Sequence, residues 1–128
     1  MAGKKKKLTK LQKEVMEEGG TEKAFTGKYV KHKGEGDFVC AKCGNPLFKS
    51  DVKFDSGTGW PSFYDAIPGS VKFKTDFKMI VPRKEVVCAK CGAHLGHVFK
   101  DAPQTPTGKR FCINSCALDF KKGRDKKK

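Results

Sequence analysis

Hydrophobic and polar positions alternate most clearly between residues 71 and 78. The first set of positions holds Val71, Phe73, Thr75 and Phe77, and the positions between them hold Lys72, Lys74, Asp76 and Lys78. A period of two predicts a half-buried strand, because successive side chains of a strand point to opposite faces of its sheet. The apolar run 79–81 extends this strand until Pro82 ends it.

Shorter apolar runs predict further strands at 37–39, 85–87, 98–99 and 110–114. A loop rich in Pro and Gly separates the last two. The segment 54–63, which carries the single tryptophan, has too much Gly, Ser and Pro for regular structure, and we expect a loop there. Together these elements predict a mainly β protein whose strands are mostly antiparallel.

One short helix is expected near the N-terminus. Thr9 followed three residues later by Gln12 is a capping-box pattern, and a short apolar stripe follows it at Leu11, Val15 and Met16. The pair Gly19-Gly20 should end this helix after about ten residues.

Charge is concentrated at the two ends of the chain. The 128 residues carry a net charge of +14, of which residues 4–7 and 121–128 together account for a net +9. We therefore expect a flexible basic arm at 1–7, a single domain at 8–120 and a flexible basic tail at 121–128. Terminal runs of like charge are usually solvated, so a contribution to solubility is favoured over weak attraction to acidic partners.

A cytoplasmic location is expected. No stretch approaches the roughly 20 apolar residues of a membrane span, and the residues after the first lysines, 8–18, are too polar for a signal peptide. In the cytoplasm, closely spaced cysteine pairs favour metal binding over disulfides.

Two identical Cys-Ala-Lys-Cys-Gly units, at 40–44 and 88–92, predict one metal site. Four thiolates in two such turns can surround a single zinc ion in a closed, structural site. A disulfide pair, a redox-active dithiol and an iron–sulfur cluster are the alternatives. The expected ligands are Cys40, Cys43, Cys88 and Cys91.

The two remaining cysteines are Cys112 and Cys116, and Cys112 is the better candidate for a nucleophile. Arg110 and Asn114 lie two residues to either side, so a strand would place all three side chains on one face. A guanidinium should lower the pKa of the thiol. Upstream, His94 and His97 could supply a general acid and its orienting partner, although a buried free cysteine with structural histidines remains an alternative.

Four motifs resemble those of the B-type methionine sulfoxide reductases, in the order found in that family. They lie at residues 20–27, 54–63, 94–99 and 110–115, and both cysteine pairs of the zinc-containing members are present. The resemblance covers about residues 8–120. It implies two antiparallel sheets, one structural zinc ion, and reduction of the R epimer of methionine sulfoxide in oxidised proteins, at the expense of a thioredoxin-like or other thiol reductant.

The resemblance also implies roles for individual residues. Cys112 falls on the nucleophile, which becomes a sulfenic acid. His97 and His94 fall on the histidines that bind and protonate the sulfoxide oxygen. Trp60 falls on the residue that packs the substrate methyl group, and the polar surroundings are Asp101, Arg110 and Asn114.

One position departs from the family pattern. Many members carry a resolving cysteine two residues before the tryptophan, where this chain has Thr58. Cys116 is the only spare thiol, and an extended strand would hold it about 13 Å from Cys112, too far for a disulfide. A bend or helix after Ser115 would shorten this distance. We favour direct reduction by an outside thiol and retain Cys116 as a resolving candidate.

A second class of function is compatible with the cysteine pairs and the charge. A non-enzymatic zinc protein could bind nucleic acid or another acidic partner through its lysines. The sequence shows no continuous basic and aromatic pattern of the kind that stacks bases, so nucleic acid is not expected as a partner. We expect a monomer with no membrane contact.

Overall fold

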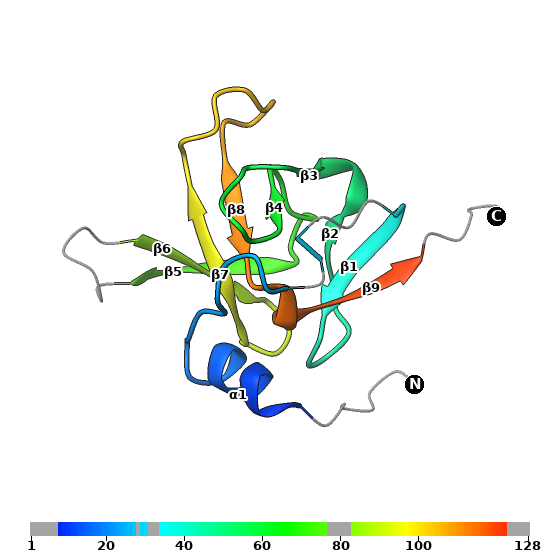
Figure 1. Ribbon diagram of the computed structural model, residues 1–128, viewed down its shortest axis with the longest axis vertical. Helices are drawn as coiled ribbons and strands as arrows, with labels where there is room; N and C mark the ends of the chain where they lie inside the picture. The colour runs from blue at the N-terminus through cyan, green and yellow to red at the C-terminus, as the bar shows by residue number, and fades with distance from the viewer. Residues whose placement is uncertain (1–7, 28, 31–33, 77–82, 123–128) are drawn as a thin grey trace.

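The computed structural model describes residues 8–27, 29–30, 34–76 and 83–122, and they form two antiparallel sheets (Figure 1). The prediction of a mainly β fold with two antiparallel sheets is therefore confirmed. One sheet has the strand order β2 (Pro46–Lys49), β1 (Gly36–Cys40), β9 (Leu118–Lys122). The other has the order β3 (Lys53–Phe54), β4 (Ser62–Phe63), β8 (Arg110–Ile113), β7 (His94–Phe99), β6 (Arg83–Cys88), β5 (Val71–Asp76).

Aromatic side chains fill the space between the two sheets. Phe38 and Phe48 come from the smaller sheet and Phe63 and Phe111 from the larger one, and all four are buried. The ring of Phe48 stacks on Phe63 with centroids 4.4 Å apart, and Phe38 meets the same ring edge-on at 5.2 Å. Burying each such side chain stabilises the fold by about 2–3 kcal/mol. This aromatic cluster fixes one sheet against the other.

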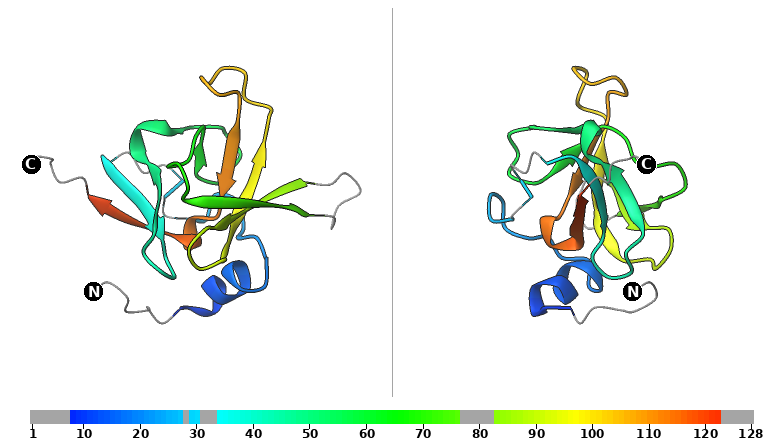
Figure 2. Two further views of the ribbon diagram at one scale, coloured as in Figure 1. Left: turned by 180° about the vertical axis from the view of Figure 1, so that it is seen from behind. Right: turned by 90° about the vertical axis from the view of Figure 1, so that its right-hand side faces the viewer.

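Helix α1 (Lys10–Met16) is shorter than the expected ten residues. The capping box is confirmed: the backbone N–H of Gln12 donates to the Thr9 hydroxyl, and the backbone N–H of Thr9 donates to the Gln12 side chain. Val15 and Met16 are buried, but Leu11 is 44% exposed, so the expected apolar stripe is wrong at that position. The helix packs at one end of the molecule against β7 and the 3-10 helix η2 (Ser115–Ala117), and its two buried residues lie in its C-terminal half (Figures 1 and 2).

Residues 71–76 of the expected strand form β5, but the apolar face of this strand is not buried as expected. Phe73 is 46% exposed because β5 is the outer strand of its sheet and lacks a covering layer there. The rest of that alternating segment lies outside the described residues. So do the arm at 1–7 and residues 123–128.

Three further elements differ from the sequence expectation. β4 forms within the segment predicted as a loop, because Ser62 and Phe63 pair with β8. A single-turn helix, η1 (Ser50–Val52), links β2 to β3. β9 includes Lys121 and Lys122, which pair with Asp37 and Gly36, so the domain extends two residues beyond the expected start of the basic tail.

Gly96 permits the close approach of β7 and β8 that places the site. A Cβ atom at this position would overlap the carbonyl oxygen of Cys112 and lie 2.9 Å from the Cα of Ile113. Neither is a flexible side chain that could move away.

We therefore predict that Gly96→Ala lowers the free energy of unfolding by about 3 kcal/mol, measured by urea denaturation. Gly69→Ala is the control: it has open space around it and φ of +78°, so it should lose only about 1 kcal/mol through backbone strain. Equal losses in the two variants would contradict the close approach of the strands.

Candidate active site and metal centre

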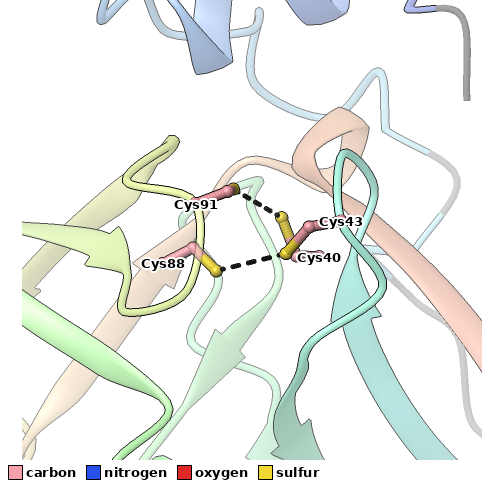
Figure 3. Close-up of side chains that lie close together, drawn as sticks. All are labelled: Cys40, Cys43, Cys88 and Cys91. Carbon is pink, nitrogen blue, oxygen red and sulfur yellow. Dashed lines mark hydrogen bonds between the residues drawn. The ribbon is translucent and has the colours of Figure 1, made fainter. Parts of the chain in front are cut away.

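Four cysteines from two hairpins meet at one point between the sheets (Figure 3). Cys40 ends β1 and Cys43 lies in the turn that leads to β2. Cys88 ends β6 and Cys91 lies in the turn that leads to β7. Each hairpin belongs to a different sheet, so a shared ion would join the two sheets.

The sulfur positions fit a tetrahedral metal. All four Sγ atoms lie within 4.8 Å of one another, with 3.7 Å between Cys40 and Cys91 and 3.6 Å between Cys43 and Cys88. A zinc ion bound to four sulfurs at about 2.3 Å requires sulfur–sulfur separations of about 3.8 Å. The side chain of Asn45 also donates to the Cys88 sulfur at 3.6 Å, a contact of the kind that orients metal ligands.

The glycine after each cysteine pair allows the turn. Gly44 and Gly92 have φ of +81° and +78°, a conformation that glycine adopts without strain. Their N–H groups donate to the carbonyl oxygens of Cys40 and Cys88, each at 2.8 Å. This repeated geometry brings both sulfurs of each pair to the same side.

The thiols of this cluster cannot all ionise without a cation. A hydrogen bond to Cys88 and burial raise the pKa of Cys40, and burial raises the pKa of Cys43. The hydrogen bond from Cys40 lowers the pKa of Cys88. One thiolate is therefore stabilised by the protons of its neighbours, whereas four thiolates at these distances repel one another. A divalent ion would remove this repulsion.

Cys112 stands in a row of side chains that crosses the larger sheet. In the strand register it lies opposite Ser62 of β4 and His97 of β7, and His97 in turn lies opposite Glu85 of β6. Residues that pair directly project from the same face, with Cβ atoms about 5 Å apart. The structure therefore places the thiol next to one of the two predicted imidazoles.

A β-bulge brings His94 to the same side. His94 lies three positions before His97, a spacing that on a regular strand would point the two side chains to opposite faces. The register between β6 and β7 shifts between Val86 and Val87, and the two imidazole rings lie 5.4 Å apart. Nδ1 of His94 is 2.7 Å from the Glu85 carboxylate, while its buried Nε2 has no hydrogen-bond partner among the described residues.

Arg110 and Asp101 form a bidentate ion pair beside the thiol. The Nε and Nη2 groups of Arg110 donate to the two carboxylate oxygens at 3.0 and 2.9 Å, and the guanidinium lies 4.5 Å above the Phe99 ring. The hydrogen bonds from Arg110 lower the pKa of Asp101, which therefore stays ionised. The pair gives the guanidinium a fixed orientation at the mouth of the site.

Burial, rather than Arg110, decides the acidity of Cys112. The guanidinium favours the thiolate, as expected, and Thr58 does so too, but burial is the larger effect and the pKa of the thiol is raised. The expectation that Arg110 leaves Cys112 with a lowered pKa is therefore wrong. Desolvation of a charged sulfur outweighs one neighbouring cation.

Glu22 was missed by sequence reasoning, although it connects several parts of the site. Its carboxylate is buried and accepts hydrogen bonds from the backbone N–H groups of Ser115 and Cys116, each at 2.9 Å. Its own N–H donates to the Asn114 side chain, and its carbonyl accepts from the Trp60 indole, both at 2.9 Å. A glutamate inside the 20–27 motif was the available signal, but only the fold reveals its partners.

Cys116 lies in a different environment from Cys112. Cys116 lies in η2, so the chain bends directly after Asn114. This is the kind of bend that was expected to shorten the distance between Cys116 and Cys112. Burial and the negative charge of Glu22 raise the pKa of Cys116 to about 12. This thiol is held in its neutral form.

The geometry defines a small β protein with a four-cysteine cluster that could hold a metal ion and a separate site that contains one cysteine and two histidines. A family model described as the SelR domain matches residues 8–122. The chain therefore belongs to the SelR-domain family, and its resemblance to B-type methionine sulfoxide reductases is confirmed.

Three relatives illustrate the similarity. The peptide methionine sulfoxide reductase MsrB of Synechococcus sp. (strain RCC307) is 55% identical over 116 residues, which cover 90% of this chain and 85% of that protein. MsrB of Methanosarcina barkeri is 54% identical over 118 residues, 91% of this chain and 82% of that protein. The mitochondrial methionine-R-sulfoxide reductase B3 of Mus musculus is 54% identical over 117 residues, 91% of this chain. The chain spans about half the length of this mouse relative (46%).

Within the described residues, no helix has the length and apolar character needed to cross a membrane.

The cysteine cluster yields a prediction about zinc. Cys88→Ser should lower bound zinc well below one ion per chain, measured by plasma mass spectrometry, and should lower stability by several kcal/mol, because structural zinc sites supply about 10 kcal/mol or more of folding energy. Cys116→Ser is the matched control and should keep its zinc. Full zinc in Cys88→Ser would exclude this residue as a ligand.

The raised pKa of Cys112 yields a prediction about pH. Alkylation of this residue by iodoacetamide, mapped by mass spectrometry, should accelerate with a midpoint above the ordinary thiol value of about 8.5. Arg110→Gln removes the cation that favours the thiolate, so its midpoint should lie higher still and its rate at pH 7 should be lower. A midpoint below 8.5 in the native chain would contradict the dominance of burial.

Proposed function

We propose that this chain reduces the R epimer of methionine sulfoxide in proteins to methionine, and so repairs proteins after oxidative damage. The observation that carries this proposal is the row in which Cys112 lies beside His97, with His94 brought to the same side by the bulge. The relatives support it, since they are named peptide methionine sulfoxide reductases.

In the proposed reaction, Cys112 attacks the sulfur of the sulfoxide. The sulfoxide oxygen accepts a proton from His97, assisted by His94, whose ring is held by Glu85. The sulfur–oxygen bond of the substrate breaks and oxygen is transferred to the cysteine sulfur. Methionine leaves in reduced form, and Cys112 is oxidised to a sulfenic acid.

The surroundings of Cys112 support selection of one epimer. We assign the substrate methyl group to Trp60, which the Glu22 carbonyl holds through the indole N–H. We assign the polar side of the substrate to Asn114 and to the Arg110–Asp101 pair. A mismatched epimer would leave buried polar groups unpaired, and this penalty gives strong discrimination.

An outside thiol is the proposed reductant of the sulfenic acid. Thr58 stands where a resolving cysteine is expected, and the high pKa of Cys116 opposes its attack as a thiolate. A thioredoxin-like protein or another dithiol would then supply two electrons and release water. Cys116 would serve as a small, partly buried side chain of η2.

The proposal also covers the metal, the oligomeric state and the basic ends of the chain. Zinc is the proposed ion of the four-cysteine cluster. Four protein sulfurs would fill all four coordination positions of the ion, so none would be left for substrate. We propose a monomer in the cytoplasm, with the basic arm at 1–7 and the basic residues after the domain contributing to solubility.

A second candidate is the binding of an acidic partner, and one observation favours it. A groove of about 480 Å³ lies on the face opposite Cys112 and is lined by basic and apolar side chains, namely Arg83, Lys84, Lys100, Lys109, Phe73, Thr75, Val98 and Phe111. The sequence did not reveal this surface because four strands contribute to it. We rank it second because it leaves the cysteine–histidine row unexplained.

An assay on the two resolved epimers tests the first proposal. With a methionine sulfoxide peptide and dithiothreitol, the native chain should turn over the R epimer alone, whereas Cys112→Ser should lose at least about 10³-fold in rate and retain its zinc. Turnover of both epimers, or unchanged turnover in Cys112→Ser, would refute the proposal.

A further inference from the structure

Glu22 is a buried acid that has no part in the proposed chemistry. Its side chain lies in a residue that is 3% exposed, and its two oxygens accept from the backbone N–H groups of Ser115 and Cys116, each at 2.9 Å. These N–H groups open η2, and the first N–H groups of a helical turn have no partner within that turn. The carboxylate supplies both acceptors and so fastens the segment 20–27 to η2.

The chain closes tightly over this carboxylate. A Cβ atom at Gly27 would lie 2.6 Å from the Oε2 atom of Glu22 and 2.2 Å from the Cβ atom of Ser115. Two residues further along, the N–H of Tyr29 donates to the Ser115 hydroxyl at 2.9 Å. The segment is therefore held against η2 at several points, and the backbone of Glu22 has a fixed position.

The backbone of Glu22 holds two side chains of the proposed site. Its carbonyl oxygen accepts from the indole N–H of Trp60, and its N–H donates to the Oδ1 atom of Asn114, both at 2.9 Å. The donor in each of these bonds is fixed, because an indole N–H and a backbone N–H can only donate. One residue therefore connects Trp60 to Asn114.

The amide of Asn114 has one orientation that satisfies all of its partners. Its Oδ1 atom must face the N–H of Glu22, and its Nδ2 group donates to the carbonyl oxygen of Leu95 at 2.9 Å. Leu95 belongs to β7, the strand that carries the two imidazoles. The connection that begins at the Glu22 carboxylate therefore extends through Asn114 to the strand of the proposed acid.

We propose that Glu22 is a positioning residue, whose carboxylate fixes Trp60 and Asn114 relative to each other and so shapes the substrate site. The inference rests on the proposed function, which assigns the substrate methyl group to Trp60 and its polar side to Asn114. Glu22 acts through these two residues and touches no reacting atom. A displacement of such contact residues by a fraction of an ångström lowers the rate of the reaction, because the substrate is then held in the wrong geometry.

Glu22→Gln tests this role with a side chain of nearly the same size. The amide has one oxygen, so one of the two N–H groups of η2 loses its acceptor. Trp60 is the single tryptophan of the chain, and its fluorescence therefore reports on this indole alone. In the full chain with zinc bound, Trp60 anisotropy should fall, quenching by acrylamide should increase, and kcat/KM for the R epimer should fall about tenfold.

Two further variants complete the experiment. Glu22→Asp keeps the charge and both oxygens but is one methylene shorter, so the same changes should be smaller; it carries the test if zinc content or thermal unfolding shows that Glu22→Gln is not folded. Gln12→Ala is the matched control. The Gln12 side chain donates to the carbonyl oxygen of Cys116 at 3.1 Å, so its loss also removes a bond to η2. It leaves the bonds to Trp60 and Asn114 intact, and the Trp60 signal should stay native.

Three results would overturn the inference. They are unchanged Trp60 fluorescence in both Glu22 variants, equal changes in Gln12→Ala, and a more mobile Trp60 with native turnover of the R epimer. The second result would reduce the effect to a general loosening of η2, and the third would separate Trp60 from the reaction rate. Failure of the proposed function gives a different outcome: the native chain would not reduce the R epimer, while the Trp60 changes in the Glu22 variants would still show that this residue holds the indole.

Discussion

The position of the site depends on four sulfur atoms that hold two hairpins from different sheets together. β7 begins three residues after Cys91 and carries both imidazoles. The paired strand β8 carries Cys112. An ion at the cysteine cluster would therefore fix the start of the strand that places the proposed acid beside the proposed nucleophile. The aromatic cluster between the sheets, led by the stacked pair Phe48 and Phe63, supplies the second constraint on the same arrangement.

Within this frame, Cys112, the proposed nucleophile, is mostly buried. Burial raises the pKa of Cys112 even though Arg110 lies beside it, so its thiolate is a minority form at neutral pH. This favours a mechanism in which local groups stabilise the thiolate while a neighbouring imidazole protonates the substrate. Arg110 serves the first task, and His97 is placed for the second. The same burial protects the thiol from reaction with unselected oxidants.

Local patterns in the sequence were sufficient for much of this description. The Cys-x-x-Cys-Gly repeats predicted the cluster because each repeat folds within a single turn, and alternation predicted β5. The Thr9 capping box depends only on residues three apart. Features that depend on distant residues were not predictable: the bulge that turns His94 toward His97, the contacts of Glu22, and the exposure of Phe73 at a sheet edge. The acidity of Cys112 was misjudged because a sequence displays Arg110 but not the surrounding burial.

The central claim is that the four clustered cysteines hold a metal while a fifth, Cys112, takes oxygen from the substrate. The most direct measurement is a single turnover without reductant, in which the protein is mixed with an equal amount of the R sulfoxide peptide and then mapped by mass spectrometry. The account predicts one methionine formed per chain, one added oxygen atom at Cys112, and retained zinc. Oxidation within the cluster at 40, 43, 88 or 91, accompanied by loss of zinc, would contradict it.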